Sequence, residues 1–441
     1  MTTSTSETFQ HAADVLRDII SRNRTGHAAG VCSVCSAHPW VLEATLAETK
    51  RTGSLALIES TSNQVNQFGG YTGQTPAQFA VAVKKLAIAA DFPSERLLLG
   101  GDHLGPHPWR QSSAQHAMEH AGEMVRDYVL AGYGKIHLDA SMTCASDPAG
   151  ALDPLVAAAR AARLCRAAED AWRRLPAGSP APLYVIGTEV PIPGGEQLES
   201  GAPTVTRVED ARSTVAQHQA AFAKLGLEEA FSRVIGLVVQ PGVEFGSDQV
   251  FAYDREPAKR LSFHLPEYPA LVYEAHSTDY QPGRALRELV EDHYAILKVG
   301  PWLTFAMREA IFALAAVERE WLGWRTGVEL SRLPEVLDGV MVRNPEHWKN
   351  YYQGGEGELR FARAYSFSDR CRYYWPRPEV RAALDRLVKN LTDRPAPLPL
   401  LSQFLPVQYE AVIDGSMAAD PASLVKDRIA QVLRLYASAT G

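Results

Sequence analysis

The sequence predicts an α/β protein in which eight parallel strands close into a (β/α)8 barrel. Two observations carry this prediction: short apolar runs alternate with stretches of helical composition, and nearly every run ends in a polar or charged residue. Continuous apolar runs are typical of parallel strands buried on both faces, and strands that alternate with helices indicate βαβ units. The expected strands are Gly30–Ser36, Leu55–Glu59, Leu97–His103, Lys135–Asp139, Leu183–Glu189, Val234–Gln240, Leu271–His276 and Ala295–Gly300.

The chain has more residues than a minimal barrel needs. A barrel of this type takes about 250 residues and can exceed 400 with insertions, and this chain has 441. We expect a helical or flexible lead at residues 1–25, the barrel at residues 26–325, with Trp302–Trp324 as its long last helix, and a mostly helical C-terminal extension at residues 326–441. The extension carries aromatic clusters such as Tyr373–Trp375. Such clusters suit either a cap on one end of the barrel or an interface, including one between copies of the chain.

Composition excludes several classes of protein. Hydrophobic residues make up 46% and charged residues 22%, a balance typical of a folded globular chain. The net charge is −7 and no basic block is present, so nucleic acid is not expected as a partner. No apolar stretch approaches the roughly 20 residues that span a bilayer. The odd number of five cysteines and the lack of a secretory signal at Met1–Gln10 favour a cytoplasmic location.

Polar residues stand where the predicted strands end. In a barrel all these ends lie on one face, and barrel enzymes place their chemistry there. One polar strand end is readily explained as a hydrogen-bonded core group, but several that converge on one face are not explained by packing alone. The sequence therefore predicts a functional face formed by Ser36, Glu59, Asp102, His103, Asp139, Glu189, Gln240 and His276.

The strongest candidate for chemistry lies in the segment Gly100–Pro106, where the carboxylate of Asp102 precedes the imidazole of His103. Glu189 and His276, at two other strand ends, complete a set of two histidines and a carboxylate. Such a set suits zinc, manganese or a similar divalent ion that acts as a Lewis acid on a carbonyl. We therefore expect His103, His276 and Glu189 to be metal ligands, and Asp102 and Glu189 to be catalytic carboxylates. The alternative is that both histidines are only hydrogen-bonded groups of the barrel.

A second candidate is the loop that follows the second strand, Glu59–Gly73, which is dense in amides, hydroxyls and glycines. Amides and hydroxyls offer donors and acceptors to sugar hydroxyl groups, and loops of this kind often carry binding residues. We also expect the strand-end residues Asp139 and Gln240 to contact the ligand. The predicted substrate-binding residues of the loop are Glu59, Asn63, Gln67, Gly69 and Gly70.

The third candidate is a phosphate site after the last two strands, formed by Ser277, Thr278 and Lys298. Hydroxyls and backbone N–H groups at this position form the usual phosphate site of barrels. Lys298 has an alternative role as a Schiff-base lysine inside the barrel. Arg370 and Arg372 are candidates for either an interface or a phosphate contact, without a spacing argument that decides between the two.

No nucleotide motif is present. The sequence has neither the GxxxxGK[ST] pattern nor a glycine-rich loop of the protein-kinase type, so an ATP-dependent kinase is poorly supported. His137, in the middle of a strand, is predicted to be a hydrogen-bonded core residue. Cys32 and Cys35 form a CxxC that no second pair completes, and we interpret them as core cysteines rather than as redox or metal groups.

At these motifs the sequence resembles a known family. The segments ESTSNQVNQFGGYTG, LGGDHLGPHPW, KIHLDASMTCASDP, VYEAHSTDYQ and SFSDRCRYYWP are similar to the Z subunit of D-tagatose-1,6-bisphosphate aldolase, the GatZ/KbaZ type. The likeness runs from about residue 20 to about residue 436, so it includes the C-terminal extension. It implies a barrel of the class II aldolase type.

The resemblance also implies a function. The Z subunit is regarded as non-catalytic and supports the activity and stability of a separate Y-type catalytic subunit in galactitol and N-acetylgalactosamine catabolism. The ligand implied is a tagatose or fructose phosphate. Some members are labelled tagatose-6-phosphate kinases, and other relatives are described as metal-dependent C4 epimerases of these phosphates. We keep the epimerase as the alternative function.

Individual residues match the class II aldolase pattern incompletely. Asp102 resembles the proton-donor aspartate, and His103 and His276 resemble metal histidines. Gln240 stands where a second metal histidine is expected, and Ser277–Asp279 replaces the glycine-rich phosphate turn. The resemblance thus implies an aldolase site that is retained in outline.

Overall fold

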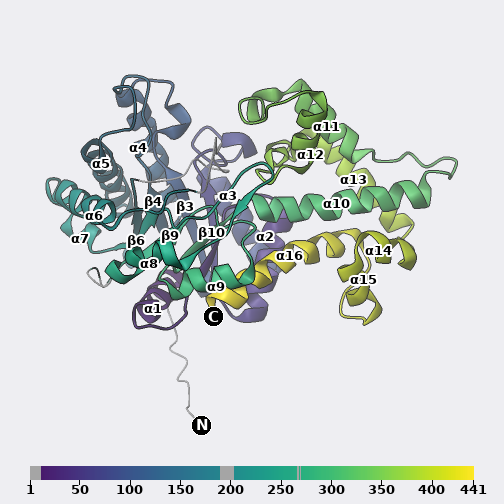
Figure 1. Ribbon diagram of the computed structural model, residues 1–441, viewed down its shortest axis with the longest axis horizontal. Helices are drawn as coiled ribbons and strands as arrows, with labels where there is room; N and C mark the ends of the chain where they lie inside the picture. The colour runs from purple at the N-terminus through teal and green to yellow at the C-terminus, as the bar shows by residue number, and fades with distance from the viewer. Residues whose placement is uncertain (1–10, 189–202, 266–267, 269) are drawn as a thin grey trace, which may run out of the picture.

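A closed barrel of eight parallel strands forms the centre of the computed structural model, which describes residues 11–188, 203–265, 268 and 270–441 (Figure 1). The strands follow one another around the barrel in chain order, and the ring closes where Val31 pairs with Ile296. All eight predicted strands are present, so the predicted fold class is confirmed. Their bounds are β1 (Val31–Val34), β2 (Ala56–Thr61), β3 (Leu97–Leu104), β4 (Lys135–Leu138), β5 (Leu183–Ile186), β6 (Val234–Val239), β9 (Val272–Ala275) and β10 (Ile296–Val299).

Helices connect the strands and cover the outside of the barrel (Figure 1). Local capping explains where several of them begin: the Thr75 hydroxyl accepts the N–H of Gln78, whose side chain in turn accepts the N–H of Thr75. A short antiparallel pair, β7 (Glu244–Phe245) and β8 (Val250–Phe251), was not predicted. Among the described residues, no helix combines the length and apolar character needed to cross a membrane. The connecting helices are α2 (Pro39–Thr52), α3 (Pro76–Ala89), α4 (Ala114–Leu130), α5 (Pro154–Trp172), α6 (Val208–Ala223), α7 (Glu228–Phe231), α8 (Arg255–His264), α9 (Gly283–Glu291) and α10 (Pro301–Leu322).

The N-terminal end of the barrel is closed by helix α1 (Ala12–Arg24). Its buried residues Leu16 and Ile20 belong to the same apolar cluster as Leu57 and Val238 of the strands. This end of the barrel interior is therefore filled by side chains. The polar cluster described below lies at the other end, where the strands end.

The C-terminal region extends from one side of the barrel and then returns to it. Figure 1 shows α10 running outward with α11–α13 on one side and α14–α15 on the other. The last helix, α16 (Pro421–Thr440), runs back along α10 and packs against α2, α9 and β1. It therefore completes the helical layer between the first and last connecting helices of the barrel. The other helices of this region are α11 (Leu333–Arg343), α12 (Glu356–Tyr365), η6 (Arg370–Tyr374), α13 (Pro378–Asp393), α14 (Leu398–Phe404) and α15 (Pro406–Ile413).

Candidate functional site

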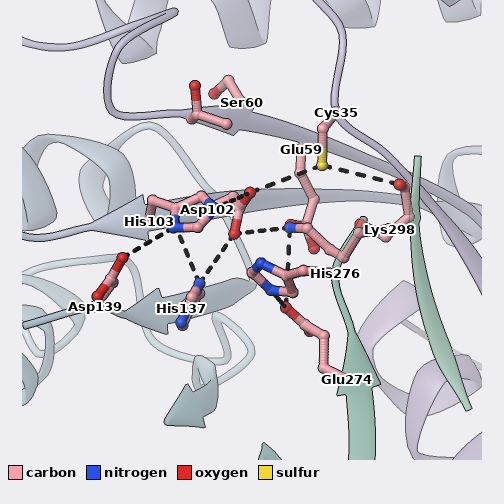
Figure 2. A network of polar contacts seen from close by, with 12 residues as sticks. Cys35, Glu59, Ser60, Asp102, His103, His137, Asp139, Glu274, His276 and Lys298 are labelled. Atoms are coloured by element: carbon pink, nitrogen blue, oxygen red, sulfur yellow. Dashed lines mark hydrogen bonds and ion pairs between the residues drawn. The ribbon is translucent and has the colours of Figure 1, made fainter. Parts of the chain in front are cut away.

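A buried network of charged side chains fills the C-terminal end of the barrel interior (Figure 2). Its centre is Asp102, at the end of β3, which is 1% exposed. Asp102 Oδ1 lies 2.9 Å from His137 Nδ1 and 2.7 Å from Lys298 Nζ. Burial raises the pKa of a carboxyl, but His103, Lys298 and His137 together hold the pKa of Asp102 well below its usual range. Asp102 is therefore an ionised carboxylate surrounded by cationic and imidazole groups.

Asp102 and His103 are adjacent in sequence, yet both side chains reach the cavity. Neighbours on a regular strand point to opposite faces, but His103 has a left-handed backbone with φ +49°, and the β3–β4 register shifts between Gly101 and Leu104. His103 Nδ1 lies 2.8 Å from Asp139 Oδ2. Burial lowers the pKa of an imidazole, but Asp102 and Asp139 outweigh this effect and raise the pKa of His103. The two carboxylates therefore stabilise the protonated form of His103.

Next to Asp102 lies a layer of four side chains of alternating charge, which the sequence interpretation found only in part. They are Glu59, Lys135, Glu274 and Lys298. Lys135 Nζ is 2.6 Å from Glu59 Oε1 and 2.7 Å from Glu274 Oε2. Lys298 contacts Glu59 as well and lies 3.9 Å from Glu274. Lys135, Glu59 and Glu274 are 0% exposed. Gly100 makes room for this layer, because a Cβ at that position would lie 2.6 Å from the Glu59 Cγ.

Lysine protonation follows from this layer. Burial lowers the pKa of a lysine, but Asp102, Glu59 and Glu274 raise the pKa of Lys298 well above its ordinary value. A Schiff-base role requires the neutral amine. The geometry thus favours Lys298 as a cation that neutralises carboxylates over the Schiff-base alternative.

Three imidazoles meet beside the charged layer. The ring centroid of His276 lies 5.0 Å from that of His103 and 5.4 Å from that of His137. His276 Nε2 is 3.0 Å from Glu274 Oε1, as Figure 2 shows. Burial lowers the pKa of His276 to about 4. His276 is thus a neutral imidazole at neutral pH, the form that binds metals.

The described residues fit a divalent metal, with a ligand set that differs from the predicted one. Asp102, His137, Glu274 and His276 each offer one ligand atom, and these atoms lie within 4.8 Å of one another. The Nε2 of His137 is buried and has no hydrogen-bond partner among the described residues. Oxygen and imidazole donors at this spacing suit a four-coordinate site. His103, by contrast, is engaged by Asp139, and Glu189 lies outside the described residues.

Part of the predicted sugar-binding loop reaches the cavity. Asn63 lines the inner cavity, together with Thr61, Gln64 and Tyr71. Gly70 lines an adjoining outer cavity, and its left-handed φ of +55° brings it against the Gln64 carbonyl, where a Cβ would clash at 2.4 Å. Gln67 points elsewhere and donates to the His120 carbonyl. Gly69, with φ +102°, shapes the turn of the loop without lining either cavity.

The remaining predicted contacts separate into two groups. Ser277 lines the inner cavity, whereas Asp139 does not line it and contacts His103. Thr278 is fully buried, and its hydroxyl donates to the Lys298 carbonyl and contacts the Tyr436 hydroxyl. The Gln240 side chain accepts the N–H of Gly242 and does not line the cavity.

The sequence interpretation missed several residues of the site. Lys135 begins the apolar run of β4 and Glu274 lies inside that of β9, and a charged residue in such a run was the available signal. Cys35, interpreted as a core cysteine, lines the cavity with its Sγ 3.8 Å from Asp102 Oδ2. Burial raises the pKa of the Cys35 thiol well above its ordinary value. Arg372, which the sequence offered as an interface or phosphate residue, and Tyr373 both line the cavity, whose volume is about 80 Å³; no local pattern places them there.

Comparison with known proteins agrees with this architecture. The sequence model of the family described as D-tagatose-1,6-bisphosphate aldolase subunit GatZ/KbaZ-like matches residues 16–441. The chain belongs to this family. The D-tagatose-1,6-bisphosphate aldolase subunit GatZ of Klebsiella pneumoniae is 51% identical over 426 residues, which cover 96% of this chain and 98% of the relative. The protein of the same name from Salmonella dublin is 52% identical with the same coverage.

A similar protein of known structure is described under a different name. The crystal structure of a probable tagatose 6 phosphate kinase from Sinorhizobium meliloti 1021 is 46% identical to this chain and superposes with a TM-score of 0.84. The superposition covers 93% of this chain and 100% of the Sinorhizobium chain. The two proteins are therefore similar in both the barrel and the C-terminal region.

Proposed function

We propose that the chain is the Z-type subunit of a D-tagatose-1,6-bisphosphate aldolase, which supports the activity and stability of a separate catalytic subunit. The observation that carries the proposal is the full-length match to relatives of that name, at 51% and 52% identity. The family match begins in α1 and ends with α16. The match therefore includes the C-terminal extension, whose last helix packs against the barrel. The ligand of the complex is a tagatose or fructose phosphate.

The proposal is tested with the purified chain and a Y-type catalytic subunit, separately and mixed. The chain alone should cleave little tagatose 1,6-bisphosphate, and its addition should raise both the aldolase rate and the unfolding temperature of the catalytic subunit. A mixture whose rate and unfolding temperature equal those of the catalytic subunit alone would contradict the proposal.

The buried residues in and beside the cavity also support a metal-dependent site. Asp102, His137, Glu274 and His276 would hold a zinc or manganese ion, and the ion would polarise a sugar carbonyl as a Lewis acid. His103, whose ring contacts Asp139, would hold a proton beside the ligand. Lys135 and Lys298 keep the surrounding carboxylates ionised. Metal content of the purified protein tests this assignment: His276→Ala should lower it, and His27→Ala, an exposed residue outside the cavity, should not.

A second candidate is a stand-alone C4 epimerase of ketohexose phosphates. The intact cluster of Asp102, His103 and His276 inside a covered cavity favours it, since a purely supporting subunit has no need of such a site. This function predicts conversion of fructose 6-phosphate to tagatose 6-phosphate by the chain alone. EDTA and His276→Ala should each abolish that conversion, and absence of product from the metal-loaded wild type would exclude it.

A further inference from the structure

The usual phosphate position of the barrel is occupied by one of the chain's own side chains. In barrels, backbone N–H groups after the last two strands and at the start of the next helix bind phosphate. Here Asp279 Oδ1 accepts the N–H of Gly300 at 3.0 Å and that of Trp302 at 2.8 Å. Asp279 is 3% exposed. A phosphate group on the ligand therefore needs other donors.

Arg370, at the start of η6, is a buried cation without a carboxylate partner among the described residues. It is 3% exposed, and its Nε and Nη2 atoms are buried without a hydrogen-bond partner. Its Nη1 donates to the His347 carbonyl at 3.1 Å, and the guanidinium stacks on Tyr351. The other buried arginines of the described chain all have a carboxylate within 4.0 Å, namely Arg160 with Asp147, Arg308 with Asp369 and Arg363 with Asp338. Because a buried, unpaired charge is costly, Arg370 indicates an anion that the described residues do not supply.

Arg372, two residues further along, faces the inner cavity. It lines that cavity together with Asp102 and Lys298. Its guanidinium is held by the Ser368 and Asp369 carbonyls and by the Tyr373 hydroxyl. No ion pair joins it to a carboxylate in the described part of the chain. A guanidinium held in one orientation by neutral groups is suited to bind phosphate oxygens.

The two arginines line two adjoining cavities. The inner cavity, which contains Arg372, and an outer cavity of about 780 Å³, which contains Arg370, share Asn63, Tyr71 and Tyr373 in their walls. Arg110 and Arg377 also line the outer cavity, where Glu346 is the acidic residue and pairs with Arg377. The outer cavity therefore has an excess of positive charge beside the neutral sugar-binding loop.

We propose that the two arginines of η6 are the phosphate-binding residues of this protein, Arg372 in the inner cavity and Arg370 in the outer one. The inference rests on the proposed function and deepens it, because it assigns the phosphate groups of the sugar ligand to the C-terminal extension. A monophosphate sugar needs one of the two arginines. A bisphosphate engages both, one at each end of the ligand.

The test is calorimetric binding of fructose 6-phosphate, fructose 1,6-bisphosphate and inorganic phosphate to the full chain. Arg370→Gln and Arg372→Gln should each weaken binding of the bisphosphate by about tenfold or more, the usual effect of losing charged hydrogen bonds. Arg372→Lys should recover part of the loss. Arg386 is an exposed arginine of α13 that pairs with Glu329. Its replacement, Arg386→Gln, should leave the affinity for the bisphosphate unchanged. Unfolding temperatures of the free variants separate loss of binding from loss of structure.

Arg110→Gln keeps the test decisive if the buried variants do not fold. Arg110 is exposed and lines the outer cavity, so its replacement should weaken bisphosphate binding severalfold without lowering the unfolding temperature. Bisphosphate affinity that is the same in the wild type and in every folded arginine variant overturns the inference. That outcome leaves the proposed function intact, because stimulation of the catalytic subunit is measured separately.

Discussion

Asp102 Oδ1 and Lys298 Nζ lie 2.7 Å apart inside the barrel, and Asp102 belongs to the group of side chains that could hold a metal. A lysine cation at this position competes with a metal ion for the same carboxylate. At an effective dielectric constant of about 20, two unit charges about 4 Å apart interact by about 4 kcal/mol. The position of Lys298 therefore controls how strongly the site binds a cation.

Lys298→Met should therefore bind zinc more tightly than the wild type, by about tenfold or more, which corresponds to about 1.4 kcal/mol. Competition with a chromogenic chelator measures the affinity. Lys389→Met is the matched control, because Lys389 forms an exposed pair with Asp393 on α13. A folded Lys298→Met protein with unchanged or weaker zinc affinity would show that Asp102 is not a ligand.

Lys135→Met should destabilise the fold. Its ammonium lies 2.6 Å from Glu59 and 2.7 Å from Glu274, and all three side chains are fully buried. Removing the ammonium takes one cation away from two buried carboxylates, and breaking a buried ion pair in this way typically costs about 3–5 kcal/mol of the free energy of unfolding. Urea unfolding measures the free energy of unfolding. In the exposed control Lys389→Met the loss should stay within about 1 kcal/mol, and a loss that small for Lys135→Met would contradict the role of the charged layer.

Two glycine substitutions should have opposite effects. Gly100→Ala places a Cβ 2.6 Å from the Glu59 Cγ, and overpacking of this kind costs about 1–3 kcal/mol. Gly122→Ala lies within α4, where nothing surrounds the new Cβ within 4 Å, and it should stabilise the protein by up to about 1 kcal/mol through helix propensity. Equal unfolding free energies for the two variants would show that Gly100 is not needed to accommodate Glu59.

Asp369 should make stability depend on pH. Burial raises the pKa of Asp369 to about 6, although Arg308 and Thr304 act to lower it. The folded state then keeps a proton that the unfolded state releases, so the contribution of Asp369 to stability falls as pH rises from about 4 to about 6. Asp369→Asn, which tolerates the left-handed backbone at φ +46°, carries no such titration.

The measurement for Asp369 is the free energy of unfolding of both proteins between pH 4 and pH 7. Relative to the wild type, Asp369→Asn should gain stability as the pH rises through this range. A difference between the two proteins that is constant with pH would contradict the prediction.

The strand-end residues were accessible from sequence, but their partners were not. Asp102, His103 and His276 follow apolar runs, and a polar residue at the end of such a run is visible in the sequence alone. Lys135 begins one run and Glu274 lies inside another, and nothing local shows that β4 and β9, which are not neighbours in the sheet, bring them together. His137 was predicted to be a hydrogen-bonded core residue, and it is one, but its partner Asp102 makes it part of the site.

By itself, the sequence determined the eight strands, the helices between them and the polar face, because apolar runs, caps and turn residues act over a few neighbouring positions. Only the tertiary structure decided which charges pair, how α16 completes the barrel layer, and that η6 covers the cavity. Arg372 lies 270 positions beyond Asp102 in the chain, yet both line one cavity. Contacts over such separations depend on how the closed barrel and the returning extension pack together, and no local pattern encodes that packing.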